Sequence, residues 1–172
     1  NNGTVGEYDI TVTGAAIQGN YKVSYTGNKY TITRATMTVS SDGYSKVYDG
    51  EEHSAVIDCT VTDGTVFTYS VDGGETFKTE VPTIQNVGSQ NVIVKASNAN
   101  YEDATAEYTL KVDYKAVTVT AKEKSKVYGE ADPEFDAEVK GTLGSDTVAY
   151  EVSCENNGTV GEYDITVTGA AI

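Results

Sequence analysis

Apolar and polar residues alternate in short runs along this chain. Within residues 163–168 every second residue is apolar, which places Tyr163, Ile165 and Val167 on one face and polar side chains on the other. We predict that this segment is a central strand whose apolar face is buried in a core. The same alternation recurs at Met37/Val39, Val92/Val94, Tyr108/Leu110/Val112 and Val117/Val119.

Turn sequences separate these runs and indicate the fold class. Turns containing Gly or Asn occur at residues 27–28, 72–74 and 157–158, with short alternating segments between them. This spacing predicts an all-β protein made of small antiparallel β-sandwich modules of the immunoglobulin-like type, arranged in tandem. The alternative is a series of β-grasp-like modules, in which residues 142–148 would supply a helical turn.

Two local features extend this prediction. Residues 21–25 and 30–34 are joined by a polar loop containing Gly and Asn, so we expect a hairpin in which Tyr25 faces Tyr30. The segment Val160-Gly-Glu-Tyr163 is similar to the corner that begins a strand in immunoglobulin-like domains. In such a corner the Tyr hydroxyl bonds back to the backbone a few residues upstream.

An internal repeat dominates the sequence. Residues 1–17 recur without a change at 156–172, and identity over this length cannot arise by chance. We therefore expect one period of a tandem array plus a short overlap. Within the period, residues 37–49 are similar to 117–129, which indicates that two related module types alternate.

The repeat also sets the expected domain boundaries. Residues 37–116 would form one complete module, 117–172 the N-terminal part of the other type, and 1–36 the C-terminal part of that type. The connections at 33–36 and 113–116 leave few residues for a flexible hinge. The modules are therefore expected to line up as a stiff rod.

Both module types resemble known repeats. Lys46-Val-Tyr-Asp-Gly50, followed by Asn86-Val-Gly88 and Asn100-Tyr101, resembles the YDG-type repeat of bacterial surface proteins. Lys126-Val-Tyr-Gly-Glu-Ala-Asp-Pro133, with Gly158-Thr-Val-Gly-Glu-Tyr-Asp-Ile165 and Gly19-Asn-Tyr21, resembles the YGX-type MBG repeat of adhesins. The resemblance implies tandem arrays on long cell-surface proteins, and it brings no catalytic residue.

Composition narrows the function classes. The chain carries 26 Asp+Glu against 12 Lys+Arg, a net charge of −14, so it would repel phosphate backbones and anionic lipids. We expect no nucleic-acid partner. No apolar run is long enough to cross a bilayer, and we expect no membrane insertion. With two Leu, one Met and 13 Tyr, a helical bundle is excluded.

Candidate chemistry is sparse. A calcium ion could be held by the alternating acids Asp132, Glu134 and Asp136, although they follow no known calcium-loop spacing and a solvated acidic face is the simpler interpretation. His53, the one histidine, is expected in a solvated loop between strands. We therefore predict no catalytic residue, no enzyme activity and no cofactor, with calcium as the one ion to consider.

The two cysteines do not indicate a disulfide framework. Cys59 and Cys154 occupy positions that do not correspond between the two module types, and a bond between them would cross from one module to the next. We predict buried free thiols at both positions.

The expected function is mechanical. The chain would be a stalk or spacer repeat of a long bacterial adhesin or fibre, outside the cell and anchored to the wall through other regions, that projects a distal binding region. The alternative is a repeat that binds host glycans or mucin weakly and gains strength by avidity. Neighbouring copies are the expected partners, head-to-tail, with residues 18–36 of one copy completing 117–172 of the next.

Overall fold

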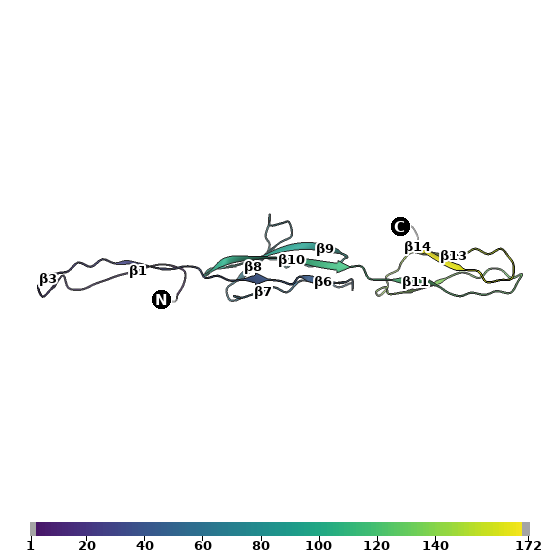
Figure 1. Cartoon of the computed structure of the whole chain (residues 1–172), viewed down its shortest axis with the longest axis horizontal. Coiled ribbons are helices and arrows are strands. Elements are labelled where there is room, and N and C mark those ends of the chain that lie inside the picture. Colours follow the sequence, from purple (N-terminus) through teal and green to yellow (C-terminus); the bar gives the residue numbers. More distant parts are fainter. Residues whose placement is uncertain (1–2, 170–172) are drawn as a thin grey trace. The chain divides into compact units, whose positions relative to one another are not determined.

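The chain is all-β. The computed structural model describes residues 3–169, in which fourteen strands form several small antiparallel sheets without a helix (Figure 1). The predicted fold class is thus confirmed. No stretch of these residues forms a helix capable of crossing a membrane. The chain divides into two compact units, one comprising residues up to 45 with 52–84 and 88–111, the other 46–51 and 85–87 with the residues from 112 onward.

Residues 37–116, which the repeat predicts to be one complete module and which are called the complete module below, contain two sheets. The larger one has four strands in the order β6-β10-β9-β8, and the smaller one pairs β5 with β7. β5 packs against β9, so the two sheets enclose a shared core. The bounds are β5 Val39–Ser40, β6 Tyr44–Val47, β7 Asp58–Cys59, β8 Val66–Ser70, β9 Gly88–Asn98 and β10 Tyr101–Asp113.

The core of this module follows the predicted alternation. In β9, Val92, Val94 and Ala96 are all completely buried, while in β10 the side chain of Leu110 is completely buried too. β9 pairs with β8 on one edge and β10 on the other, so both of its edges are hydrogen-bonded to neighbouring strands. The rest of the cluster comprises Met37, Val39, Ala55, Tyr69 and Tyr108.

The N-terminal residues pair differently from the prediction. β1 (Gly6–Ile10) pairs antiparallel with β4 (Asn28–Ile32), and β2 (Ile17–Gln18) pairs with β3 (Tyr21–Lys22). The expected hairpin was therefore wrong, since Tyr30 lies opposite Tyr8.

Contacts of Tyr25 explain this difference. Its hydroxyl donates to the carbonyl oxygen of Ala15 at 3.0 Å and accepts from Nε2 of Gln18 at 2.6 Å. Tyr25 is therefore held against the preceding loop, and β4 pairs with β1.

The C-terminal segment contains two two-stranded sheets. β11 (Thr118–Ala121) pairs with β12 (Ala137–Lys140), and β13 (Tyr150–Cys154) pairs with β14 (Ile165–Gly169). β11 lies against β14. Residues 142–148, which the β-grasp alternative would make helical, contain a turn closed by the amide of Asp146 and the carbonyl of Leu143 at 2.9 Å.

The predicted strand at 163–168 is only partly confirmed. Ile165 and Val167 lie on the more buried face of β14 and Thr166 on the exposed one, as expected. However, Tyr163 precedes the strand, and β14 has one paired neighbour within residues 3–169. The prediction of a central strand was wrong, because β14 has a hydrogen-bonded strand on one edge alone.

Candidate functional site

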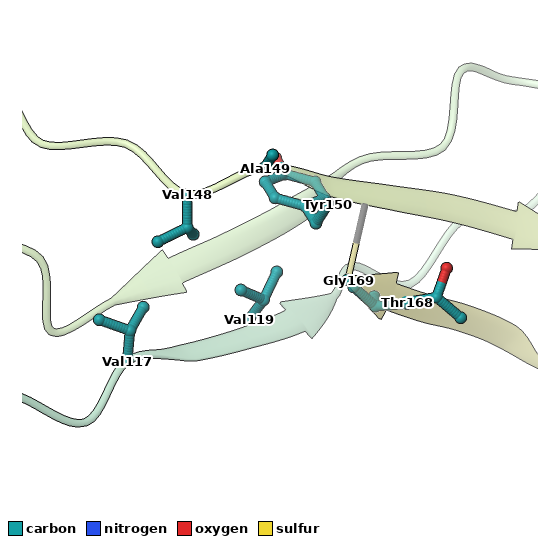
Figure 2. A pocket seen from close by; sticks show the side chains of 8 residues that line it. Val117, Val119, Val148, Ala149, Tyr150, Thr168 and Gly169 are labelled. Carbon is teal, nitrogen blue, oxygen red and sulfur yellow. The ribbon is translucent and has the colours of Figure 1, made fainter. Parts of the chain in front are cut away.

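An apolar groove lies between the two sheets of the C-terminal segment. Its volume is about 290 Å³, and Figure 2 shows Val117 and Val119 pointing toward Val148 across it. None of the lining side chains is charged, so the groove suits an apolar occupant and offers no acid or base for catalysis. It is lined by Val117, Val119, Val148, Ala149, Tyr150, Val167, Thr168 and Gly169.

The groove corresponds to the core of the complete module. The similarity of residues 37–49 to 117–129 makes Val117 and Val119 the counterparts of Met37 and Val39. Met37 is 7% and Val39 8% exposed. In the C-terminal segment, residues 113–169 contain one buried side chain, that of Ala137. The side chains that line the groove are thus less buried than their counterparts in residues 37–116.

Strand registers support the same correspondence. In the complete module Tyr69 lies opposite Val94 and Phe67 opposite Ala96. In the C-terminal segment Val152 lies opposite Val167, and Tyr150 opposite Gly169. Because Val167 and Gly169 occupy the repeat positions of Val94 and Ala96, β13–β14 reproduces β8–β9 residue by residue.

The N-terminal segment reproduces the other half of that sheet. Gly6 corresponds to Gly88 in the repeat, and Tyr30 corresponds to Tyr108. β1–β4 is therefore the counterpart of β9–β10, which are neighbours in the complete module. By this correspondence, the N-terminal and C-terminal segments would each contain one copy of the central strand of that sheet.

The two identical copies share a tyrosine corner. The Tyr8 hydroxyl donates to the carbonyl oxygen of Thr4 at 2.7 Å, and the Tyr163 hydroxyl donates to that of Thr159 at 3.0 Å. The side chain of Asn157 also accepts from the Tyr163 hydroxyl. The predicted return of this hydroxyl to the backbone is confirmed, and it occurs in both copies.

Pairing, however, uses different parts of the two copies. The N-terminal copy pairs through Gly6–Ile10, and the C-terminal copy through Ile165–Gly169, which corresponds to residues 10–14. Residues 161–164 of the second copy belong to no strand. The two copies therefore pair through different residues, except at the shared position Ile10/Ile165.

The predicted calcium ligands are occupied by lysines. Asp132 pairs with Lys126 at 2.6 Å, while Asp136 pairs with Lys122 and Lys124, each at 2.5 Å. Glu134 is exposed. Among residues 3–169, no group of three His, Cys, Asp or Glu side chains is placed to hold a metal ion. Calcium binding stays a prediction of the sequence.

The lysines also set the charge state of Asp136. Hydrogen bonds from Lys122 and Lys124 lower the pKa of its carboxyl to about 2. Asp132 has a lowered pKa for the same reason, through Lys126. Both carboxyls are therefore ionised at neutral pH and are partners in ion pairs, which is a structural role.

His53 does not lie in a solvated loop, so that prediction was wrong. Its ring is half-buried and stacks on Tyr44 with 4.5 Å between ring centroids. Its backbone exchanges two hydrogen bonds with Ile84, at 2.9 and 2.8 Å. Those bonds fix the segment against its neighbour and place the ring on Tyr44.

Both cysteines are free and half-buried. The Cys59 thiol donates to the carbonyl oxygen of Val61 at 3.1 Å. Cys154 lies opposite Ile165 in β13–β14. The prediction of free thiols is confirmed, although neither side chain is completely buried.

One network of polar side chains was not predicted from the sequence. The buried Ser70 hydroxyl donates to Oδ1 of Asp72 at 2.6 Å, and the amide and hydroxyl of Thr76 donate to the same carboxylate. These neutral donors hold the pKa of Asp72 far below its usual range. The signal in the sequence was Ser-x-Asp-Gly-Gly-x-Thr, a turn stabilised by its own side chains.

The groove residues outside the alternating strands, Val148 and Ala149, were missed as well. Tyr150 also lies in the groove wall. The alternation in the sequence did place Val117, Val119 and Val167 on apolar strand faces.

Comparison with known proteins gives one match. Residues 117–171 match the family model of the MBG domain (YGX type). No curated protein and no solved structure matches the chain. The matched range begins at Val117, where the repeat places the start of the second module, and it contains the whole groove. This segment is therefore similar to the MBG domain of the YGX type.

Proposed function

We propose that this chain is a spacer segment of a long repeat protein on the bacterial cell surface, outside the cell, which holds a distal binding region away from the wall. The observation that carries the proposal is that both connections flanking the complete module are hydrogen-bonded to neighbouring β-structure. A spacer needs joints that resist bending.

The first connection is fixed through Ala35. Its amide donates to the carbonyl oxygen of Asn100 at 3.0 Å, and its carbonyl accepts from the amide of Glu102 at 2.8 Å. The side chain of Asn100 also accepts from the amide of Val5 at 3.3 Å. Three hydrogen bonds thus hold the chain where one module passes into the next.

The second connection lies within the other compact unit. The amide of Tyr48 donates to the carbonyl oxygen of Asp113 at 2.9 Å, and Nε2 of Gln85 donates to that of Gly50 at 2.8 Å. A Cβ at position 50 would lie 3.6 Å from Cδ1 of Leu143. Loops of the complete module therefore pack with the segment that follows it.

The core and the groove supply no catalytic group, which supports a structural, non-enzymatic role. Apart from the hydroxyls of the core tyrosines Tyr69 and Tyr108, Ser70 is the one buried polar side chain among residues 3–169, and it is hydrogen-bonded to Asp72. The groove lining contains no acid and no histidine. The similarity of residues 117–171 to the MBG domain supports the same role.

Small-angle scattering on chains of one to four periods tests the proposal. A spacer is expected to increase the maximum dimension by a constant increment per period. Ala35→Pro, which lacks the donating amide, is expected to reduce that increment, and Ala35→Ser, which keeps it, is expected to leave it unchanged. A dimension that grows as the square root of the period number would overturn the proposal.

The alternative of glycan binding is decided by the same chains. Each is applied to an array of host glycans and mucins. Retention that rises steeply with period number would replace the spacer proposal with an avidity mechanism, whereas no retention at any length supports the spacer.

A further inference from the structure

The turn that leads into the second tyrosine corner contains an Asn-Gly pair. Asn157 and Gly158 lie in the connection between β13 and β14. Gly158 has a φ of +75°, in the left-handed region that favours glycine, so the backbone of the turn itself calls for this residue. A glycine in this place also leaves its own backbone nitrogen open to the side chain of the preceding asparagine, because it has no Cβ.

The side-chain carbonyl of Asn157 is surrounded by hydrogen-bond donors. Its Oδ1 accepts from the Thr159 amide at 3.2 Å, from the Thr159 hydroxyl at 2.7 Å and from the Tyr163 hydroxyl. Donors directed at a carbonyl oxygen stabilise the negative charge that this oxygen acquires when a nucleophile attacks the carbon. The tyrosine corner therefore makes Cγ of Asn157 a better electrophile.

The nitrogen that can attack this carbon is also hydrogen-bonded. The Gly158 amide donates to Oδ1 of Asn156 at 3.2 Å. An acceptor on the amide hydrogen draws that proton away from the nitrogen, which makes the nitrogen more nucleophilic. Adjacent residues thus present a polarised N–H and a polarised carbonyl to each other, which is the arrangement that favours an intramolecular reaction.

We propose that Asn157–Gly158 is a site of spontaneous covalent modification, at which the folded chain deamidates Asn157 through a succinimide. The nucleophile and the electrophile both belong to the chain, and the one co-reactant is water. The hydrogen bonds from Thr159 and Tyr163 set the rate. This modification goes beyond the spacer role, and either proposal can fail without the other.

The bond changes balance without an oxidant or a reductant. The Gly158 nitrogen bonds to Cγ of Asn157, and the proton that it loses passes through solvent to the side-chain nitrogen. The bond between Cγ and that nitrogen breaks and ammonia leaves, which closes the succinimide ring. Water then opens the ring at either of its carbonyl carbons and gives aspartate or isoaspartate at position 157. The net reaction consumes one water and releases one ammonium ion.

The two products are expected to affect the corner differently. Aspartate keeps an acceptor oxygen where Oδ1 of Asn157 lies, so the bonds from Thr159 and Tyr163 can persist while a negative charge is added. Isoaspartate carries the main chain through the former side chain, which lengthens the turn and displaces the acceptor of the Tyr163 hydroxyl. We therefore expect isoaspartate to weaken the corner and aspartate to preserve it.

Asn98 of the complete module provides a comparison within the same chain. Its Oδ1 also accepts from the amide two residues later, that of Asn100, at 3.0 Å. Its Nδ2 is held as well, by the carbonyl oxygen of Asp63 and the hydroxyl of Thr65, each at 3.0 Å. The turn contact is the same, but the next residue is Ala99 and not glycine. Asn98 is therefore expected to stay unmodified.

Peptide mapping by mass spectrometry tests the site. The folded chain is incubated at neutral pH, and its digests report aspartate and isoaspartate at each asparagine. The same chain unfolded in denaturant at the same pH gives the rate that the sequence alone supports. We expect Asn157 to react faster in the folded chain than in the unfolded one, and Asn98 to remain asparagine. If Asn157 reacts no faster in the folded chain, the proposal is overturned, whereas the spacer proposal is unaffected.

Substitutions that each remove one donor test the activation. Tyr163→Phe and Thr159→Val should each slow the folded reaction about 2- to 10-fold, the factor that one neutral hydrogen bond supplies, and should leave the rate in denaturant unchanged. The identical copy provides the matched controls Tyr8→Phe and Thr4→Val, which should not alter the rate at Asn157. A faster folded reaction in Tyr163→Phe and Thr159→Val would show that the hydrogen bonds restrain the side chain, and would contradict the proposal.

Discussion

The complete module and the two partial copies predicted at residues 1–36 and 117–172, called half-modules below, contain the same strand. Its side chains are buried to very different extents in them. Ile10 and Val12 are 48% and 49% exposed, while Val92 and Val94, at the same positions of the repeat, are completely buried. Between residues 3 and 36 no side chain is buried. The difference lies in the neighbours, because β9 is paired on both edges and covered by β5, whereas β1 has β4 alone.

This comparison separates two requirements for a core. Alternation decides which face of a strand is apolar, and every copy of the repeat satisfies it equally. Burial also needs a second layer and both flanking strands, which lie far away in sequence. A half-module therefore has the pattern of a folded sandwich without its stabilisation.

The largest expected loss of stability comes from truncating Leu110, a completely buried side chain of the complete module. Leu110→Ala should destabilise the complete module by about 2–5 kcal/mol, because the side chain is fully enclosed and leaves a cavity. Ile32→Ala, at the matching position of β4, should cost about 1 kcal/mol or less because it is half-buried. Amide exchange resolved by residue measures both segments in one sample. Equal losses would show that the half-module has a core of its own.

A second prediction compares the same substitution in a chain of one period and in a tandem of two periods. Ile165→Ala should cost about 1 kcal/mol in the monomer, where this side chain is half-buried, and about 2–4 kcal/mol in a tandem of two periods that contains the completed module. Denaturant unfolding of both lengths checks the increase.

Thr166→Ala is the matched control for that experiment. Thr166 faces solvent, and its hydroxyl lies 3.0 Å from the Ser153 hydroxyl, so the change should cost about 0.5 kcal/mol at either length. If Ile165→Ala and Thr166→Ala behave alike in the tandem, Ile165 does not become part of a core.

Much of the fold could be predicted from local pattern. The alternation at Val92/Val94 and at Tyr108/Leu110 predicted strands that the structure contains, with the expected side chains buried. The turn at 72–74 follows β8 directly. These features depend on residues close together in the sequence, so the local pattern of apolar and turn residues is enough to predict them.

The predictions that were wrong concern which strands pair, and this depends on segments that lie far apart in the sequence. Tyr30 could pair with the nearby residues 21–25 or with β1, and both alternatives satisfy the alternation. The structure has the second pairing, in which Tyr25 is held by Ala15 and Gln18. In the same way, the sequence of residues 163–168 is that of a central strand, and a missing neighbour leaves β14 at an edge.

A third, smaller prediction tests what the identical copies share. Tyr8→Phe and Tyr163→Phe each remove a hydroxyl that donates to the backbone four residues upstream. Each should cost about 0.5–1.5 kcal/mol of local stability, similar in both copies, because the corner depends on its own sequence and not on the paired strand. Amide exchange of the residues next to Thr4 and Thr159 measures the local stability of the two corners. A loss confined to one copy would show that strand pairing supports the corner.

The smallest expected effect distinguishes two aspartates with lowered pKa values, one in each region. Asp136 is held by Lys122 and Lys124, which lower its pKa to about 2, while Asp72 is held by the neutral donors Ser70 and Thr76. Salt screens charge pairs far more than hydrogen bonds from hydroxyl and amide groups. Raising the salt to about 1 M should therefore move the pKa of Asp136 toward its usual value and leave that of Asp72 low.

The sign of the pH dependence follows from the direction of these shifts. A carboxyl whose pKa is lower in the folded chain stabilises it above the unfolded pKa, near 4, and this contribution is lost as pH falls through the folded value. Acid should thus weaken the β11–β12 region between about pH 4 and 2, and less so in high salt, whereas the β8 turn should hold to lower pH at either salt. NMR titration of the two carboxyls reads both directly. If salt leaves Asp136 unchanged, its ion pairs with Lys122 and Lys124 do not persist in solution.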